Sequence, residues 1–240
     1  QLWLTGFPDQ GLAAIQDAVS LARQVGHPQT TARALYYAGV LHYSRGEYDA
    51  LRERATEVLG LGDQHGIFAF FTVGARLLAH LGGSPGPKLD DLSAELARLQ
   101  RGGVRARRVF LAMLLAEAYG LAGRPDRGLD VVGEALIAIE AGAERYYESA
   151  HHRVRGELRL AVDPSAEDAE ACFRRAVNAA QAIGGRSLEL RAATSLARRL
   201  AARGATTEAR ETLAPVLGAF TEGHDTRDLR TASALLSKIG

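Results

Sequence analysis

Turn residues recur along the chain at nearly constant spacing, and this spacing is the strongest constraint on the fold. The turns fall at Gly6, Gly46, Gly83, Gly123, Asp163 and Gly204, which are 40, 37, 40, 40 and 41 residues apart. The segments between them carry apolar residues every three or four positions, as one face of a helix requires. A period near 40 residues with two helices per repeat is typical of an α-solenoid. We therefore expect an all-α fold, a superhelix of antiparallel helical hairpins that forms one domain over residues 1–240.

One of these hairpins is clearest in the sequence AEAYGLAGRPDRGLDVVGEA, residues 116–135. Two helices cross closely only where the facing residues are small, and Ala116, Gly128 and Ala135 are small. A single hairpin cannot bury its apolar face alone, so it needs neighbours of the same kind. The expected helices are 10–25, 29–45, 48–64, 67–81, 89–99, 105–121, 127–141, 144–161, 166–183, 186–203, 206–220 and a capping helix at 226–239.

The charge balance argues against a chain built to coat nucleic acid or an anionic membrane. Lys and Arg total 29 and Asp and Glu total 28, a formal net charge of +1. No apolar run is long enough to span a bilayer and no signal peptide is visible, so we expect a cytoplasmic protein. The chain begins at Gln1 rather than Met, and we expect it to be part of something longer.

The registers of the hairpins resemble the tetratricopeptide repeat. That repeat places a small residue, an aromatic residue three positions on, a glycine at the turn, and Ala, Phe and Ala in the second helix. The positions that match are Gly39, Gly46 and Tyr48; Ala116, Tyr119, Gly123 and Ala135; and Gly156, Ala169, Phe173 and Ala176. The usual repeat is 34 residues long, so the period here departs from it by about one and a half helical turns.

A second resemblance covers most of the chain. The segments that carry it are 111–123, 152–160, 169–177, 186–200 and 213–236, and the stretch TEGHDTRDL at 221–229 is the most specific. Together they resemble the C-terminal repeat region of bacterial multidomain signalling proteins. In those proteins a class III adenylate or guanylate cyclase domain, or a DNA-binding domain, precedes a P-loop signal-transduction ATPase. No Gly-x-x-x-x-Gly-Lys-Ser/Thr loop occurs in these 240 residues, so the resemblance implies regulation rather than catalysis.

The function that we expect is a non-catalytic protein–protein interaction domain, the C-terminal sensor arm of a larger cytoplasmic signalling ATPase or adenylate cyclase-like protein. Its partner would be a protein or peptide, including the parent protein's own ATPase domain. Formation of a homo-oligomer is a further alternative. One alternative is a ligand- or peptide-sensing repeat domain of a bacterial transcription regulator. Another is an enzyme with an unfamiliar site. We predict no catalytic residue, cofactor or metal, and no binding of nucleic acid or membrane.

A partner would dock on the inner surface of the solenoid, which the first helix of each hairpin should line. Arginine and aromatic side chains supply much of the energy at interfaces. The positions expected to face this groove are Arg33, Tyr36, Tyr43, Met113, Glu117, Arg153, Glu157, Arg191 and Arg198.

Other clusters have simpler interpretations. His151 and His152, near Glu148 and Glu157, approach a metal site, but adjacent residues on a helix point about 100° apart, and His152 falls in a packing position. The basic clusters Arg105, Arg107 and Arg108, and Arg198, Arg199 and Arg203, are interspersed with acidic residues, which favours solvated helix faces. Cys172 is the only cysteine, and we expect a small buried thiol.

Overall fold

The computed structural model describes residues 1–84, 86–101 and 108–240. Arg105 and Arg107 of the predicted basic cluster lie outside the described residues, as does the side chain of Arg108. The described residues form helices and turns without a strand, so the all-α prediction is confirmed. The helices are α1 (Pro8–Val25), α2 (Pro28–Arg45), α3 (Tyr48–His65), α4 (Ala69–Leu81), α5 (Leu89–Arg101), α6 (Arg108–Leu121), α7 (Pro125–Glu140), α8 (Glu148–Val162), α9 (Asp168–Ala182), α10 (Arg186–Ala202), α11 (Thr206–Gly218) and α12 (Arg227–Ile239), with a 3₁₀ turn, η1, at Arg145–Tyr147.

The helices form two layers, as consecutive hairpins in a helical solenoid do. Each even-numbered helix from α2 to α12 contacts the next even-numbered helix, and these six helices form the inner layer. The odd-numbered helices pack on the outside: α1 contacts α2, and each of the others contacts the inner helices before and after it. All five predicted glycine turns, at positions 6, 46, 83, 123 and 204, have positive φ, which glycine adopts at little cost.

The close crossing predicted for the hairpin of α6 and α7 is confirmed. A Cβ atom added to Gly128 would lie 2.9 Å from the carbonyl oxygen of Ala116, so only glycine fits there. The same Cβ would lie 2.8 Å from a methyl group of Leu158 on α8. A Cβ added to Gly120 of α6 would also lie 2.8 Å from Leu158. Leu158 therefore packs into the space that these two glycines leave, and it joins α8 to the preceding hairpin.

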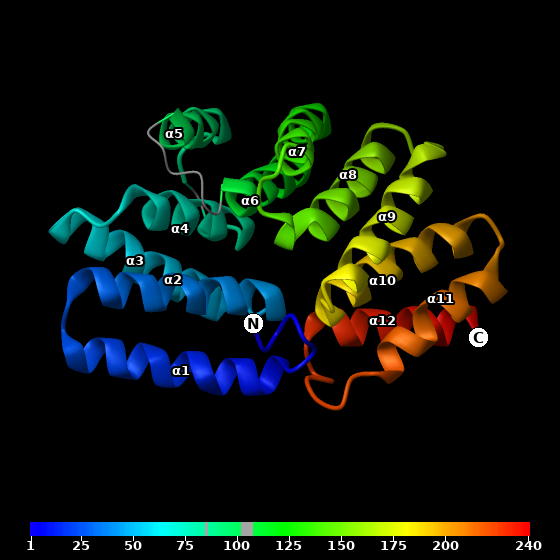
Figure 1. Ribbon diagram of the computed structural model, residues 1–240, viewed down its shortest axis with the longest axis horizontal. Helices are drawn as coiled ribbons and strands as arrows, with labels where there is room; N and C mark the ends of the chain where they lie inside the picture. The colour runs from blue at the N-terminus through cyan, green and yellow to red at the C-terminus, as the bar shows by residue number, and fades with distance from the viewer. Residues whose placement is uncertain (85, 102–107) are drawn as a thin grey trace.

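The arc of helices turns back on itself until its two ends meet (Figure 1). The carboxylate of Glu222, in the loop before α12, accepts hydrogen bonds from the backbone N–H groups of Asp9 (2.8 Å) and Gln10 (3.1 Å). Those N–H groups belong to the first turn of α1 and have no partner within their own helix. In return, the carboxylate of Asp9 accepts a hydrogen bond of 2.9 Å from the N–H of Gly223.

Ser187 makes two further contacts with the start of the chain, and Arg45 supports the closure by holding Asp9. The N–H of Ser187, at the start of α10, donates to the carbonyl of Leu4 at 3.1 Å, and its hydroxyl donates to the carbonyl of Trp3. Arg45, which is almost fully buried at the end of α2, donates to Asp9 at 2.8 Å and to Glu47 at 2.6 Å. We call the inner layer, closed by these contacts, the ring. None of the described helices is long and apolar enough to cross a membrane.

Candidate functional site

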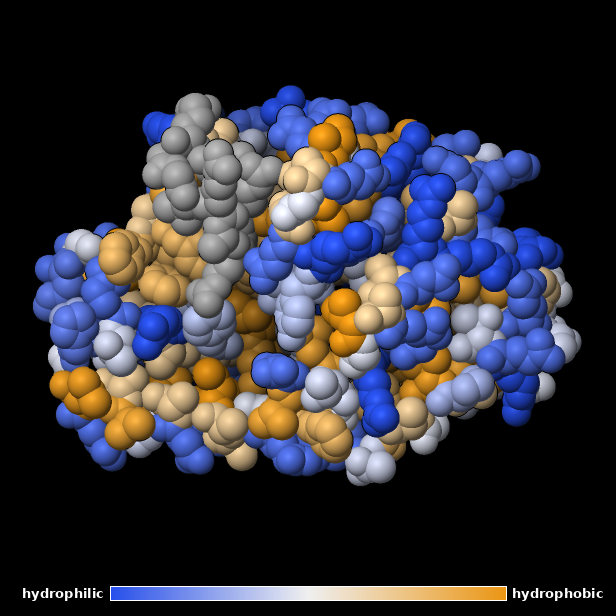
Figure 2. Space-filling model, in the orientation of Figure 1, coloured by the Kyte–Doolittle hydropathy of each residue, from blue (hydrophilic) through white to orange (hydrophobic). Residues whose placement is uncertain are grey.

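A pocket of about 470 Å³ lies at the centre of the ring, and we call it the central pocket. Every inner helix contributes to its wall: Tyr43 from α2, Leu81 from α4, Glu117 from α6, Arg153 from α8, Arg191 from α10 and Asp228 from α12. The molecule is hollowed near the centre of the face shown in Figure 2. Six of the nine residues predicted to face a groove line the pocket, namely Tyr43, Glu117, Arg153, Glu157, Arg191 and Arg198.

The other three predicted groove residues lie elsewhere. Tyr36 is only 1% exposed and Met113 only 5%, so both belong to the core, and the prediction that they face a groove is wrong. Tyr36 and Tyr43 share one face of α2, but α4 covers the middle of that face. A Cβ on Gly74 of α4 would lie 2.5 Å from the ring of Tyr36. Arg33 is exposed and does not line the central pocket.

This difference has a simple physical cause. The inner helices contact one another in sequence, and α2, α4 and α6 reach the central pocket only near their C-terminal ends. Met113 and Glu117 are one turn apart on the same face of α6, yet only Glu117 reaches the pocket. Residues that share one direction around the helix axis therefore differ in their access to the pocket, because position along the axis decides which of them a ligand can reach.

Arg191 is the most constrained charged side chain of the pocket. Its Nε donates to Asp228 of α12 at 2.7 Å, and its Nη2 donates to the carbonyl of Ser44, at the end of α2, at 2.7 Å. Its guanidinium lies 4.9 Å from the ring centroid of Trp3, within the range of a cation–π contact. Burial disfavours the charge, but the attraction of Asp228, with smaller contributions from Glu117 and Tyr48, outweighs burial and raises the pKa of Arg191 above its ordinary value. Arg191 is therefore a permanent cation that also holds the ends of the chain together.

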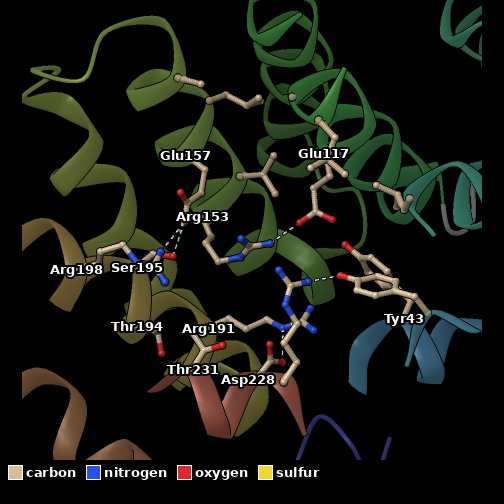
Figure 3. A pocket seen from close by; sticks show the side chains of 18 residues that line it. Tyr43, Glu117, Arg153, Glu157, Arg191, Thr194, Ser195, Arg198, Asp228 and Thr231 are labelled. Atoms are coloured by element: carbon tan, nitrogen blue, oxygen red, sulfur yellow. Dashed lines mark hydrogen bonds and ion pairs between the residues drawn. The ribbon is translucent and has the colours of Figure 1, made fainter. Parts of the chain in front are cut away.

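One more ion pair and one hydrogen bond to a carboxylate face the same space. Arg153 and Arg191 project from α8 and α10 toward each other, with Glu117 and Asp228 beside them (Figure 3). Arg153 donates to the carboxylate of Glu117 across the gap between α8 and α6. On the other side of the pocket, Glu157 accepts a hydrogen bond from the hydroxyl of Ser195 at 2.6 Å.

Arg198 forms the loosest of the pocket's ion pairs. Its guanidinium lies 3.8 Å from Glu157, and its side chain is half exposed. Its two basic neighbours make contacts of their own. Arg199 donates to the carbonyl of Pro164 at 3.1 Å, and Arg203 pairs with Glu170 and Glu208, each at 3.1 Å. This basic cluster is thus engaged within the chain.

Sequence reasoning missed the contribution of Tyr48, Arg227 and Asp228. The guanidinium of Arg227 lies 5.6 Å from the ring centroid of Tyr48 and donates a hydrogen bond to its hydroxyl. Arg227 and Asp228 lie in the 221–229 stretch that carries the more specific resemblance, so this stretch contains residues of both the pocket and the ring closure. The 221–229 stretch stood out in the sequence, but its structural role depends on contacts with residues near the other end of the chain.

The two adjacent histidines of α8 do not act together. His151, rather than His152, occupies the buried packing position, contrary to the prediction. Burial lowers the pKa of His151 to about 4, and its Nδ1–H donates to the carbonyl of Tyr147 at 3.0 Å. Among the described residues, no group of three or more His, Cys, Asp or Glu side chains is placed to hold a metal ion. Cys172 is buried as predicted, and burial raises the pKa of its thiol.

Comparison with known proteins gives a distant relationship to part of a longer protein. No family model matches the chain. An uncharacterized protein of Rhizobium meliloti (strain 1021) is 26% identical to it over 202 residues. The matched region covers 81% of this chain and 19% of that protein, so the chain spans about a fifth of the relative's length.

Proposed function

We propose that this chain is a non-catalytic regulatory domain that binds a small ligand in the central pocket and passes the bound state to the rest of a larger protein. The observation that carries the proposal is that all six inner helices, from α2 to α12, meet at one pocket. A ligand held there would contact segments from nearly the whole chain. Its binding energy would therefore act on the curvature of the entire ring, and a population shift needs such a difference between free and bound states.

The geometry favours a small ligand over an extended partner. Contacts between residues 213 apart close the ring, and the space at its centre is a half-open pocket of about 470 Å³. Ligand pockets commonly have volumes of about 300–1,000 Å³. This favours the ligand-sensing alternative over docking of the parent protein's ATPase domain.

Catalysis has less support than binding. The pocket acids Glu117 and Asp228 each contact an arginine directly, and Glu157 accepts a hydrogen bond from Ser195. A general acid or base needs an ionisable group whose proton can reach a substrate at neutral pH. Here the carboxylates of Glu117 and Asp228 are hydrogen-bonded to arginine side chains rather than left free for proton transfer. The arrangement suits electrostatic recognition of a bound molecule.

The more specific statements about family and context also belong to this proposal. The positive-φ glycines at 6, 46, 83, 123 and 204 support a tetratricopeptide-like repeat with a period near 40 residues. The much greater length of the Rhizobium relative supports a parent protein with further domains. A cytoplasmic parent of the signalling type, with an ATPase domain and either a cyclase or a DNA-binding domain, is the arrangement that the sequence resemblance implies.

The test blocks the pocket with a tryptophan side chain introduced at an exposed residue of its wall. Thr231 of α12 lines the pocket and is exposed, whereas Ser233, two residues on, is exposed and does not line it. A library of metabolites and short peptides is screened by thermal unfolding against the wild-type chain, Thr231→Trp and Ser233→Trp. A ligand at about 100 times its Kd adds about 2.7 kcal/mol of stability, or roughly 5–10 °C in Tm.

The two tryptophan variants decide the outcome. We expect at least one compound to stabilise the wild-type chain and Ser233→Trp but not Thr231→Trp. A library without such a compound would refute the ligand-binding proposal. Equal stabilisation of all three proteins would also refute it, because the compound would then bind away from the pocket.

A further inference from the structure

We infer that the ligand of the central pocket is an amphipathic carboxylate, that is, a small monoanion with an apolar portion. Its carboxylate group would bind Arg227 and the other arginines of the pocket. The inference rests on the proposed function, since it names the ligand class of the same pocket. Three observations carry it: the charge count of the wall, the spare hydrogen-bond donors of its arginines, and an exposed leucine at the pocket.

The charged residues of the wall do not balance. Four arginines line the pocket, at 153, 191, 198 and 227, against the three acids Glu117, Glu157 and Asp228. One positive charge is therefore left over. A monoanion neutralises this excess, whereas a dianion such as a phosphate ester would leave the opposite excess. The charge count thus favours a carboxylate over a dianionic phosphate.

Arg227 is the arginine that supplies the excess charge. Arg191 pairs with Asp228, Arg153 with Glu117, and Arg198 lies within 4 Å of Glu157. Arg227 makes no ion pair with any acid in the part of the chain that the structure describes, and its contact is with the neutral hydroxyl of Tyr48. A guanidinium has five N–H donors in a planar fork, which matches the two oxygens of a carboxylate. Arg227 therefore has donors to offer without breaking an ion pair.

An apolar surface lies beside these charges. Leu81, Val154 and Leu158 line the pocket from α4 and α8 and are themselves buried. Leu121, at the end of α6, also lines the pocket but is 74% exposed, one of the most exposed large apolar side chains of the described residues. A ligand with an apolar portion would cover Leu121 and gain free energy by removing this apolar surface from water. A fully polar anion would leave this surface exposed.

Calorimetric titration of the 240-residue chain tests the ligand class with three probes. Octanoate carries both the carboxylate and the apolar chain, octanamide has the same chain without the charge, and acetate has the charge without the chain. We expect octanoate to bind and the other two to bind at least about tenfold more weakly, a difference of about 1.4 kcal/mol. If octanamide binds as tightly as octanoate, or if acetate does, the inferred class is wrong.

Three variants test the residues involved. Arg227→Gln should weaken octanoate binding by about tenfold or more, because hydrogen bonds to charged groups are the stronger ones. Arg230→Gln is the matched control, since Arg230 is exposed on the same helix and does not line the pocket, and it should leave binding unchanged. Leu121→Ala should weaken the binding of octanoate and not that of acetate. An Arg227→Gln variant that is folded, by circular dichroism, and binds octanoate as the wild type does would overturn the assignment.

Failure of this inference can be distinguished from failure of the proposed function. Suppose that none of the three probes binds, while the library contains another compound whose stabilising effect Thr231→Trp abolishes. The central pocket then binds ligands of another class, so the inference is wrong and the proposed function stands. If the library contains no such compound and octanoate does not bind, both are wrong.

Discussion

The fit of Leu158 between two glycines allows a stability prediction whose sign can be worked out from the structure. Replacing Gly128 by Ala would place a Cβ atom 2.8 Å and 3.1 Å from the two methyl groups of Leu158, and 2.9 Å from the carbonyl oxygen of Ala116. Leu158 is buried, and its Cδ2 methyl would also lie 2.8 Å from a Cβ on Gly120. The side chain of Leu158 therefore has little room to move away from the added Cβ atom. The backbone of Ala116 can move even less than this side chain.

Gly133 provides the matched control. It lies on the same helix, α7, and a Cβ atom added there would meet nothing within 4 Å. Replacing glycine by alanine within a helix stabilises it by about 0.5–1 kcal/mol, because alanine loses less conformational entropy. Overpacking a core typically costs about 1–3 kcal/mol. The propensity gain is common to both variants, so Gly128→Ala should be about 1–3 kcal/mol less stable than Gly133→Ala.

Urea unfolding followed by far-UV circular dichroism measures this difference. We expect Gly133→Ala to unfold at a higher urea concentration than the wild type, and Gly128→Ala to unfold at a lower concentration than Gly133→Ala, with unchanged slopes. If the two variants have the same midpoint, α6, α7 and α8 do not pack as closely as the structure has them. The reasoning about glycine at this crossing would then be refuted.

Two further predictions concern pH and ring closure. His151 has a pKa near 4 in the folded chain and an ordinary pKa near 6.5 in the unfolded chain. As the pH falls, the unfolded chain is therefore protonated at His151 before the folded chain is. The free energy of unfolding should decrease between about pH 6.5 and pH 4, by at most about 3 kcal/mol. A His151→Gln variant should show a shallower loss in pH-dependent urea unfolding, and an unchanged slope would contradict the burial of His151. Glu222→Gln should destabilise the chain by roughly 1 kcal/mol at neutral pH, because a neutral amide is a weaker acceptor for the N–H groups at the start of α1. Burial alone would raise the pKa of Glu222, but the hydrogen bonds from Gln10 and Asp9 outweigh burial and lower it. The stability difference between the wild type and Glu222→Gln should therefore have its full size above the ordinary carboxyl pKa, and it should vanish as the pH falls through the lowered value. A stability difference that does not depend on pH would refute the role of Glu222 at the start of α1.

Local features of the chain could be predicted well from the sequence. The turn at Gly123 and the small residues Ala116 and Gly128 act within one hairpin, where the signal and its consequence are a few residues apart. The expected helix at 127–141 corresponds to α7 at Pro125–Glu140, and the structure extends it to the proline, whose fixed φ suits the first helical position. Such signals depend on backbone conformation and on nearest neighbours, and both can be read along the chain.

Depth within the fold could not be predicted in the same way. Tyr36 and Tyr43 are seven residues apart, so they share one face of α2 and carry the same sequence signal. What separates them is Gly74 of α4, whose missing side chain lets the next inner helix cover Tyr36. The prediction for Met113 fails for a similar reason, since it shares a face with Glu117 but is buried in the core. Helical periodicity gives the direction of a side chain and says nothing about what lies in front of it.

Ring closure was the feature least predictable from the sequence, because it depends on the sum of many small rotations between hairpins. In a solenoid each hairpin is rotated slightly from the previous one, and the total curvature accumulates along the array. An error of a few degrees per repeat, invisible in any one hairpin, decides whether the ends meet or pass each other. The contacts that record the outcome join residues as far apart as Asp9 and Gly223, 214 positions along the chain. The central pocket depends on the same sum, since Arg191 and Arg227 reach Ser44 and Tyr48 only when the ends meet.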